Sequence, residues 1–254
     1  MNQAGQGGGL SRPGGDASPA FATTHWSVVL AARELGDAEQ AHTALCRLCE
    51  DYWYPLYAYV RRRGHAHEDA ADLTQAFFAR FLDHGFIHDV TPGVGRFRSF
   101  LLSAIKHFLA NEWDRARALK RGGGETPVSL DDEEARRRYA LEPADPVTPE
   151  TLYERRWALA VLEQVLARLR AEFDAREKGG LFDRLKVFLT ADQPEGAYAA
   201  TATAAGLSEG AVKVAVHRLR RRYGELLRAQ IAGTVADPAD VGAEVRHFIA
   251  MLGR

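Results

Sequence analysis

The sequence contains few cysteines and no long apolar segment, and these two shortages exclude several classes of protein. Its 254 residues include two cysteines, Cys46 and Cys49, too few for a disulfide-stabilised secreted domain and typical of a reducing compartment. No run approaches the roughly 20 consecutive apolar residues that a membrane span requires. Residues 1–20 also lack the charged-then-apolar order of a signal peptide. We therefore expect a cytoplasmic protein.

The alternating pattern of β-strands is missing as well. From Thr24 onward the apolar residues recur every three or four positions, and no β-branched run is bounded by turn signals. This periodicity predicts an all-α fold, which glycine- and proline-rich stretches divide into parts. We expect a disordered tail (1–22), a helical domain (23–120), an irregular acidic linker (121–149), a second helical domain (150–232) and a C-terminal amphipathic helix (233–254).

The C-terminal segment has the features of a short helix that packs on the rest of the chain. Asp237 and Pro238 suit the cap and the first helical position. An isolated helix of this length is marginal in water, so we expect it to dock. The apolar stripe predicted to face the protein consists of Val241, Val245, Phe248, Ile249 and Leu252.

Charge is unevenly distributed along the chain, although the formal net charge is only −1. Residues 96–121 hold seven basic and two acidic residues, and residues 213–228 hold six basic and one acidic, so each block carries +5. Between these blocks, residues 131–154 hold eight acids and three arginines, a net charge of −5. The two basic blocks indicate two surfaces suited to nucleic acid.

Residues 198–223 have the order of a helix-turn-helix: a helix of small residues, a glycine turn and a basic helix. Gly206 suits the left-handed backbone where the first helix ends, Leu207 is expected to fill the gap between the helices, and Ser208 to cap the second one. The face predicted to pack consists of Val212, Ala215, Val216, Leu219, Tyr223, Leu226 and Leu227. The opposite, basic face is then available to a DNA groove.

The first domain has one basic and one acidic helix. The helix predicted over 96–117 has an apolar face that we expect to be core, formed by Phe97, Phe100, Leu101, Ala104, Ile105, Phe108, Leu109 and Trp113. Its other side offers groups that bind phosphates or base edges, namely Arg98, Lys106, His107, Asn111, Arg115 and Arg117. Upstream, Glu68, Asp69, Asp72 and Gln75 precede three phenylalanines in an acidic helix suited to a basic protein partner.

These motifs resemble those of the extracytoplasmic-function sigma factors, in the same order. Residues 68–78, Glu-Asp-Ala-Ala-Asp-Leu-Thr-Gln-Ala-Phe-Phe, look like the helix of that family that binds the polymerase clamp. Residues 97–101, Phe-Arg-Ser-Phe-Leu, and the helix that follows look like its promoter-melting helix. Residues 197–227 are similar to its promoter-reading domain. Residues 10–35 and those after Gly233 lie outside the two-domain pattern and look like the extensions of a subgroup.

The resemblance implies two domains, called sigma region 2 and sigma region 4, that recruit RNA polymerase to promoters. Core polymerase, through its beta-prime clamp and beta flap, and promoter DNA are the implied partners, and an anti-sigma factor is a further one. Carried over by position, Asp72, Gln75 and Phe78 would contact the clamp. Residues at the minus-10 element would be Arg98, Lys106, His107, Asn111, Arg115 and Arg117. Residues at the minus-35 element would be Ser208, Glu209, Gly210, Lys213, His217, Arg218, Arg220 and Arg221.

Two alternatives remain on the sequence alone. A helix-turn-helix by itself also fits a transcription regulator that binds its operator without polymerase. His42, Cys46 and Cys49 have a His-x3-Cys-x2-Cys spacing that suits zinc. The same helical face holds Leu45, however, and small cysteines are common in cores, so we favour a structural role and expect no cofactor.

An enzyme is not expected. The glycine run at 122–124 lacks the Gly-Lys-Ser/Thr of a phosphate-binding loop, and no Gly-x-Ser-x-Gly occurs in the chain. The paired acids fall in the predicted linker or on solvated helix faces. We therefore interpret the chain as a binding protein.

Overall fold

The computed structural model of the chain describes residues 39–82, 96–118, 132–140, 147–189 and 193–253. Every regular element in these ranges is a helix, apart from an isolated antiparallel bridge between Arg96 and Val235. The all-α prediction is therefore confirmed. None of the described helices combines the length and the apolarity that crossing a bilayer needs. The predicted tail, residues 1–22, lies outside the described residues.

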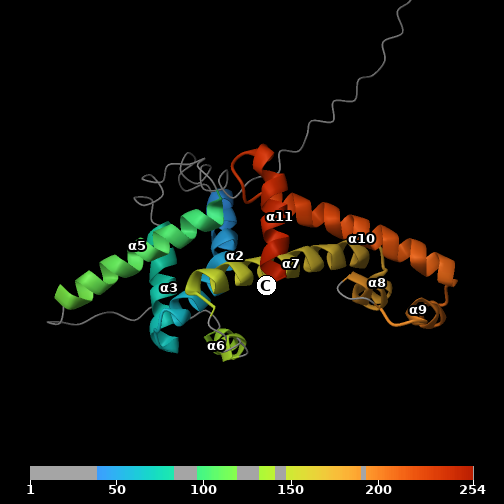
Figure 1. Ribbon diagram of the computed structural model, residues 1–254, viewed down its shortest axis with the longest axis horizontal. Helices are drawn as coiled ribbons and strands as arrows, with labels where there is room; N and C mark the ends of the chain where they lie inside the picture. Colours follow the sequence, from blue (N-terminus) through green and yellow to red (C-terminus); the bar gives the residue numbers. More distant parts are fainter. Residues whose placement is uncertain (1–38, 83–95, 119–131, 141–146, 190–192, 254) are drawn as a thin grey trace, which may run out of the picture.

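The long helix α7 (Pro149–Asp174) runs through the middle of the molecule (Figure 1). At one of its ends lie α2 (Glu39–Arg62), α3 (His67–Leu82) and α5 (Phe97–Ala118), with the short α6 (Asp132–Ala140) below them. At the other end lie α8 (Gly179–Leu185), the 3-10 turn η1 (Lys186–Leu189), α9 (Ala197–Ala205) and the start of α10 (Glu209–Ala232). The chain closes with the turn η2 (Pro238–Asp240) and α11 (Val241–Leu252), which crosses α7 between the two ends.

The first hydrophobic core surrounds α2. Tyr52, Leu56, Tyr57 and Tyr59 are almost completely buried, and they pack against aromatic residues of α3 and α5. Phe77 and Phe81 of α3 and Phe97 of α5 are joined by edge and stacked contacts with ring centroids 6.1–6.5 Å apart. Each buried large side chain contributes about 1.5–3 kcal/mol relative to exposure, so this cluster fixes the positions of α3 and α5.

A second core joins the far half of α7 to the helix-turn-helix. Its fully buried members include Leu169 of α7, Leu185 of α8, Phe188 of η1 and Val212 of α10. Phe188 also packs on Tyr198 of α9, with ring centroids 4.6 Å apart. The orientation of α10 therefore depends on the four elements that precede it, α7, α8, η1 and α9.

Two sequence predictions about the middle of the chain need correction. The linker expected to be irregular contains the helix α6, where Ala135 is 4% exposed against the first core. The expected boundary at residue 149 does not separate the cores, because α7 contributes Tyr153 and Trp157 to the first and Val165 and Leu169 to the second. One continuous helix thus belongs to both cores.

The C-terminal helix docks as expected, but with a different face. Asp237 caps η2 by accepting a hydrogen bond from the Ala239 N–H (2.8 Å). Glu244, Phe248 and Met251 are the buried residues of α11. Ile249 and Leu252, which were predicted to pack, are 62% and 36% exposed. The packed stripe is therefore rotated to one side of the predicted stripe, and it includes a carboxylate.

Candidate nucleic-acid interface

The turn between α9 and α10 has the local geometry that its residues predict. Gly206 adopts a φ of 65°, in the left-handed region that a side chain disfavours. The Ser208 side chain then accepts a hydrogen bond from the Ala211 N–H (3.2 Å) and caps α10. Both predictions are confirmed. Leu207, expected to fill the gap between the helices, is instead 42% exposed, so that prediction is wrong.

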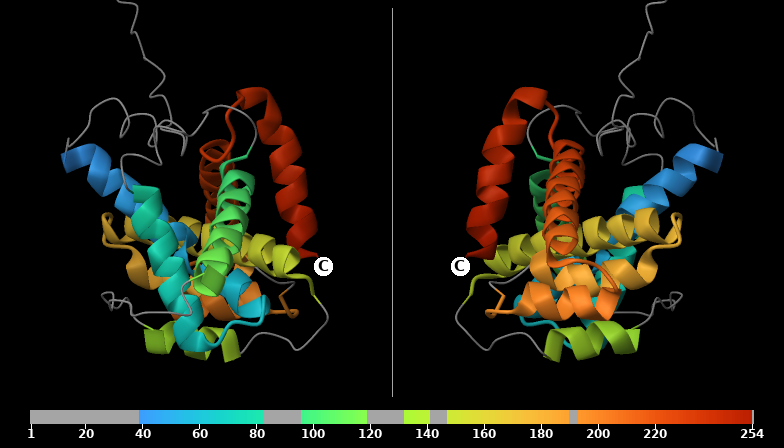
Figure 2. Two further views of the ribbon diagram at one scale, coloured as in Figure 1. Left: turned by 90° about the vertical axis from the view of Figure 1, so that its left-hand side faces the viewer. Right: turned by 90° about the vertical axis from the view of Figure 1, so that its right-hand side faces the viewer.

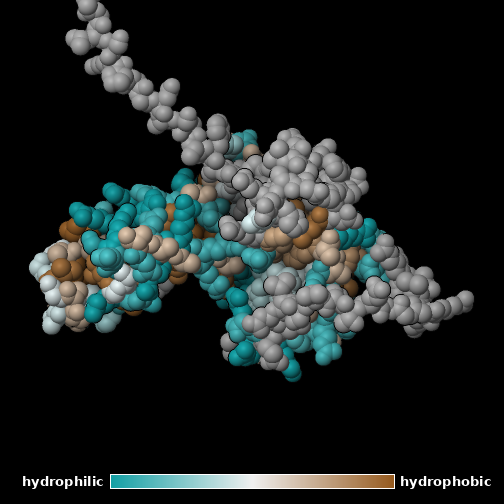
Figure 3. Space-filling view, turned by 180° about the vertical axis from the view of Figure 1, so that it is seen from behind, coloured by the Kyte–Doolittle hydropathy of each residue, from teal (hydrophilic) through white to brown (hydrophobic). Residues whose placement is uncertain are grey.

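The packing face of α10 is also close to the predicted one. Val212, Val216, Leu219 and Leu226 are buried against α7, α8, η1 and α9. The residues predicted to face the minus-35 element are all exposed: Ser208, Glu209, Gly210, Lys213, His217, Arg218, Arg220 and Arg221. The end of the molecule formed by α8, α9 and the start of α10 therefore presents hydrophilic residues beside exposed apolar ones (Figure 3).

Lys213 lies at the centre of this exposed face. Its Nζ is 2.6 Å from Glu209 Oε1 one turn earlier, and that interaction raises the pKa of the lysine. The ammonium also lies 5.7 Å from the centre of the Tyr198 ring. These neighbours orient a positive charge near the start of α10, the part of a recognition helix that reaches base edges.

Two arginines of α10 are occupied within the protein. Arg220 Nε donates to the Phe188 carbonyl (2.9 Å), and Arg222 donates to both carboxylate oxygens of Glu172 (2.7 and 2.9 Å). The hydrogen bonds that Arg222 donates to Glu172 and Glu225 raise the pKa of its guanidinium. These contacts tie α10 to η1 and α7, so Arg220 acts as a positioning residue as well as a surface cation.

Val214 belongs to the same surface and was missed from the sequence. It is 50% exposed and follows Lys213, on the stripe that also contains Gly210 and His217. An exposed valine on a basic helix face is suited to contact the methyl group of thymine. Helical spacing from Gly210 would have revealed it, because positions i, i+3, i+4 and i+7 share one face.

The predicted basic surface of α5 is arranged differently. Arg98 is fully buried, so in this structure it does not reach a surface open to DNA, and its prediction as a DNA contact needs correction. Lys106 is 41% exposed and pairs with Glu150 of α7 (Nζ to Oε1, 2.7 Å). His107 and Asn111 are exposed, and the side chains of Arg115 and Arg117 lie outside the described residues.

His107 and Asn111 line a cavity of about 230 Å³ between α3 and α5. Its walls include Phe77, Phe81 and Phe100, with Arg80 and Ser103 at polar positions. A pocket with aromatic walls and a few polar groups can hold a planar base by stacking and hydrogen bonding. Trp113, predicted to be core, is 60% exposed two residues after Asn111 and adds a further stacking surface.

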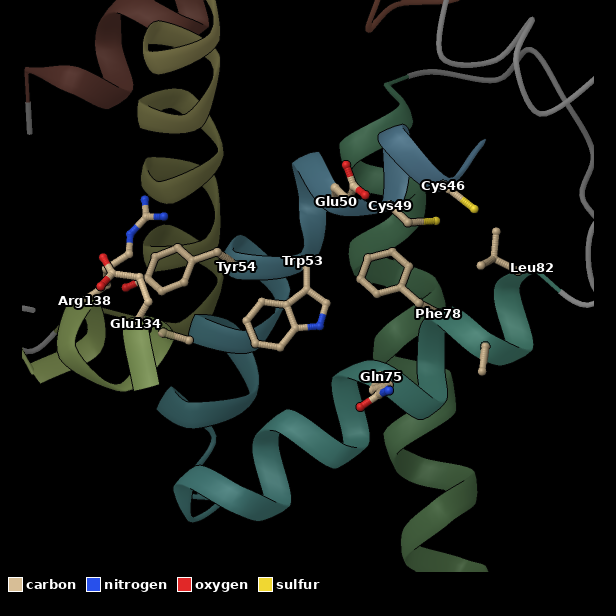
Figure 4. A pocket seen from close by; sticks show the side chains of 12 residues that line it. Cys46, Cys49, Glu50, Trp53, Tyr54, Gln75, Phe78, Leu82, Glu134 and Arg138 are labelled. Atoms are coloured by element: carbon tan, nitrogen blue, oxygen red, sulfur yellow. The ribbon is translucent and has the colours of Figure 1, made fainter. Parts of the chain in front are cut away.

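Two of the three residues predicted to bind polymerase, Gln75 and Phe78, line a larger cavity of about 520 Å³ between α2, α3 and α6. Asp72 is exposed, Gln75 is half-buried and Phe78 is 6% exposed. Gln75 and Phe78 of α3 face Glu50 and Trp53 of α2 across the cavity, while Glu134 and Arg138 of α6 lie near Tyr54 (Figure 4). The cavity is thus apolar with charged groups at its rim.

The zinc alternative does not gain support from the described residues. Cys46 is half-exposed and Cys49 is buried; neither forms a disulfide within the described residues, and burial raises the pKa of Cys49. Metal ligation requires a thiolate, which burial disfavours. No cluster of three metal-ligating residues occurs in the described part of the chain; the side chain of His42 lies outside it.

Comparisons with known proteins find no match: no family model fits the chain, and no curated protein or solved structure is similar to it. The interpretation of the candidate surfaces therefore depends on their geometry. The α9–α10 unit and the α5 surface lie toward opposite ends of the molecule, joined by α7 (Figure 1).

Proposed function

We propose that this chain is a sigma factor of the extracytoplasmic-function type, which directs core RNA polymerase to specific promoters in the cytoplasm. The observation that carries the proposal is the helix-turn-helix at α9 and α10, with its Gly206 turn, its Ser208 cap and an exposed face of basic and polar residues. This arrangement supports major-groove reading by the start of α10.

We assign a different promoter element to each end of the molecule. Residues 23–120 would act as sigma region 2, with the α3–α5 cavity accepting an unstacked base of the minus-10 element. Residues 150–232 would act as sigma region 4 and read the minus-35 element. Exposed cations such as Arg218 and Arg221 would hold the phosphate backbone, whereas Lys213 and Val214 would contact base edges.

The proposed polymerase contact is the α3 surface. Asp72 is exposed one turn before Gln75, which lines the apolar cavity together with Phe78. An acidic residue next to an apolar hollow complements a partner surface that offers basic and apolar side chains. The beta-prime clamp would supply such a surface here, and the beta flap would bind the region around α10.

The test is run-off transcription with core polymerase, with and without the protein, on fragments of the source genome. We expect discrete transcripts that disappear when Asp72 and Gln75 are both replaced by alanine. The matched control is Glu163→Gln, which alters an acid of α7 that is 64% exposed and should leave the transcripts unchanged. No transcripts, together with tight operator binding by the protein alone, would instead identify a polymerase-independent regulator.

A further inference from the structure

The segment that follows α10 is joined to the start of α5 through its backbone. The Phe97 N–H donates to the Thr234 carbonyl (3.1 Å), and Arg96 forms its bridge with Val235. Thr234 and Val235 are buried. From this anchor the chain turns at η2, and α11 returns across α7 on the side where α5 lies (Figure 2).

A buried ion pair holds α11 in place. Arg98 of α5 donates to Glu244 of α11, and both side chains are fully buried. The Arg98 guanidinium lies 4.6 Å from the centre of the Trp157 ring, and the Tyr153 hydroxyl donates to the Arg98 carbonyl (2.9 Å). Phe248 packs edge-on against the same Trp157, at 5.8 Å between ring centroids. Arg98 of α5 and Trp157 of α7 thus form a cleft between these helices, and this cleft receives one carboxylate and one aromatic ring from α11.

This cleft leaves polar atoms unsatisfied. Arg98 Nε and Nη2 are buried and have no hydrogen-bond partner among the described residues. Arg96 Nε lies 2.6 Å from Glu244 Oε2, but the two groups are not oriented as a hydrogen bond requires. A buried pair with incomplete hydrogen bonding stabilises a fold less than apolar residues of the same shape would. Water or phosphate oxygens would satisfy the Arg98 guanidinium better than the closed cleft does.

Acids of α7 and α11 also neutralise α5. Arg96 and Arg98 face Glu244, and Lys106 faces Glu150 of α7 at 2.7 Å. These three are all the cations of α5 and its first flank whose side chains the structure describes. A DNA phosphate would need to displace the same carboxylates to reach them. The closed arrangement therefore opposes binding of DNA at this end.

We propose that the cleft between α5 and α7 is a receptor for an acidic amphipathic helix, and that α11 is its detachable intramolecular ligand, which withholds Arg96 and Arg98 from DNA. This inference rests on the proposed function. The ligand motif is a carboxylate, an aromatic ring and an apolar residue at i, i+4 and i+7, here Glu244, Phe248 and Met251. Promoter or polymerase binding displaces α11 and releases the two arginines.

The test measures DNA affinity of the full-length chain by fluorescence anisotropy, using a duplex with an internal single-stranded bubble over a range of salt concentrations. Glu244→Gln leaves the buried Arg98 charge uncompensated and opens the cleft. We expect at least fivefold tighter binding at low salt. The slope of log affinity against log salt should steepen by about 1–2, because each newly made phosphate contact adds close to one. Amide exchange over 241–252 should rise in parallel.

Ile249→Ala is the matched control, since it alters an exposed residue of the same helix and should change neither measurement. Phe248→Ala provides a second way of opening the cleft without altering a charge, and it decides the matter if Glu244→Gln fails to fold. Faster exchange in α11 with unchanged DNA affinity would overturn the inference. Absence of DNA binding and of polymerase-dependent transcription in every variant would refute the proposed function instead.

Discussion

The two basic ends of the molecule carry the same net charge in the sequence but present it differently. On α10, Arg218 and Arg221 are exposed, and Arg221 remains 71% exposed although it pairs with Glu225 of the same helix (Nε to Oε1, 3.6 Å). On α5, Arg98 is buried and Lys106 is paired with Glu150. Counting charges along the chain therefore finds both blocks, whereas only the packing shows which of them is open.

The difference follows from where the acids lie. Glu209 and Glu225 belong to α10 itself, so they reduce its charge without covering it. Glu150 and Glu244 come from other helices and approach α5 across a packed interface. Pairs within one helix persist in any state of the protein, but pairs between helices can separate. On α10, Arg222 also pairs with another helix, through Glu172 of α7, but Lys213 and Arg221 pair within α10. Arg98 and Lys106 of α5 both pair with other helices, so the charge of the α5 end depends more on conformation.

The largest expected effect is the loss of the buried pair. Arg98→Ala leaves Glu244 buried without its main partner. The free energy of unfolding, measured by urea denaturation, should fall by up to about 3–5 kcal/mol. If detaching α11 costs less free energy than keeping the unpaired carboxylate buried, α11 detaches and Glu244 returns to water. The loss of stability then equals the free energy of detaching α11. Arg218→Ala, on the open helix, should stay within about 0.5 kcal/mol. Equal stabilities for both variants, with no rise in amide exchange over 241–252 in Arg98→Ala, would contradict the burial of Arg98.

The helix-turn-helix could be predicted from the sequence because its signals are local. Gly206 and Ser208 act on backbone groups within a few residues, and the packing residues of α10 recur at helical spacing. The helix α5 was predicted for the same reason. The all-α class follows from the same periodicity along the whole described chain.

The state of Arg98 could not be predicted in the same way. Its partner Glu244 lies 146 residues away, and a helical pattern gives no information about distant partners. Part of the signal was present, since Arg98 shares the face of Leu101 and Ile105, which are buried. An arginine on an apolar face requires a buried acid, but any of several acids fitted. The packing of α7 across both cores could not be predicted either, because the proline-rich composition before it predicts a domain boundary at residue 149, where a continuous helix begins.

Variants on the exposed face of α10 should change DNA recognition, an effect of intermediate size. Replacing Lys213 or Val214 by alanine should change the preferred promoter sequence, since a good base contact discriminates by about 1–3 kcal/mol. Arg221→Ala should weaken binding to all sequences alike and reduce the salt slope by about 1. Selection of binding sites from randomised duplexes, in complex with polymerase, measures the preference, and affinities at several salt concentrations measure the slope. An unchanged preference in the Lys213 and Val214 variants would move base reading to another face of α10.

The smallest expected effect concerns Lys106, an exposed cation of α5. Its hydrogen bond lowers the pKa of Glu150 below the ordinary value of 4.5, so this pair stabilises the protein above that pH and ceases to do so as the pH falls through the lowered pKa. Both side chains are 41% exposed, which limits the contribution to a few tenths of a kcal/mol, at most about 1. Glu150→Gln should therefore be slightly less stable than the parent at neutral pH and equally stable in acid. Thermal melts across this pH range check whether the two stabilities converge in acid, and a difference that persists there would show that Glu150 acts through packing.

The same variant frees Lys106 and should strengthen DNA binding less than Glu244→Gln does, because DNA phosphate already displaces Glu150 from a solvent-exposed pair easily.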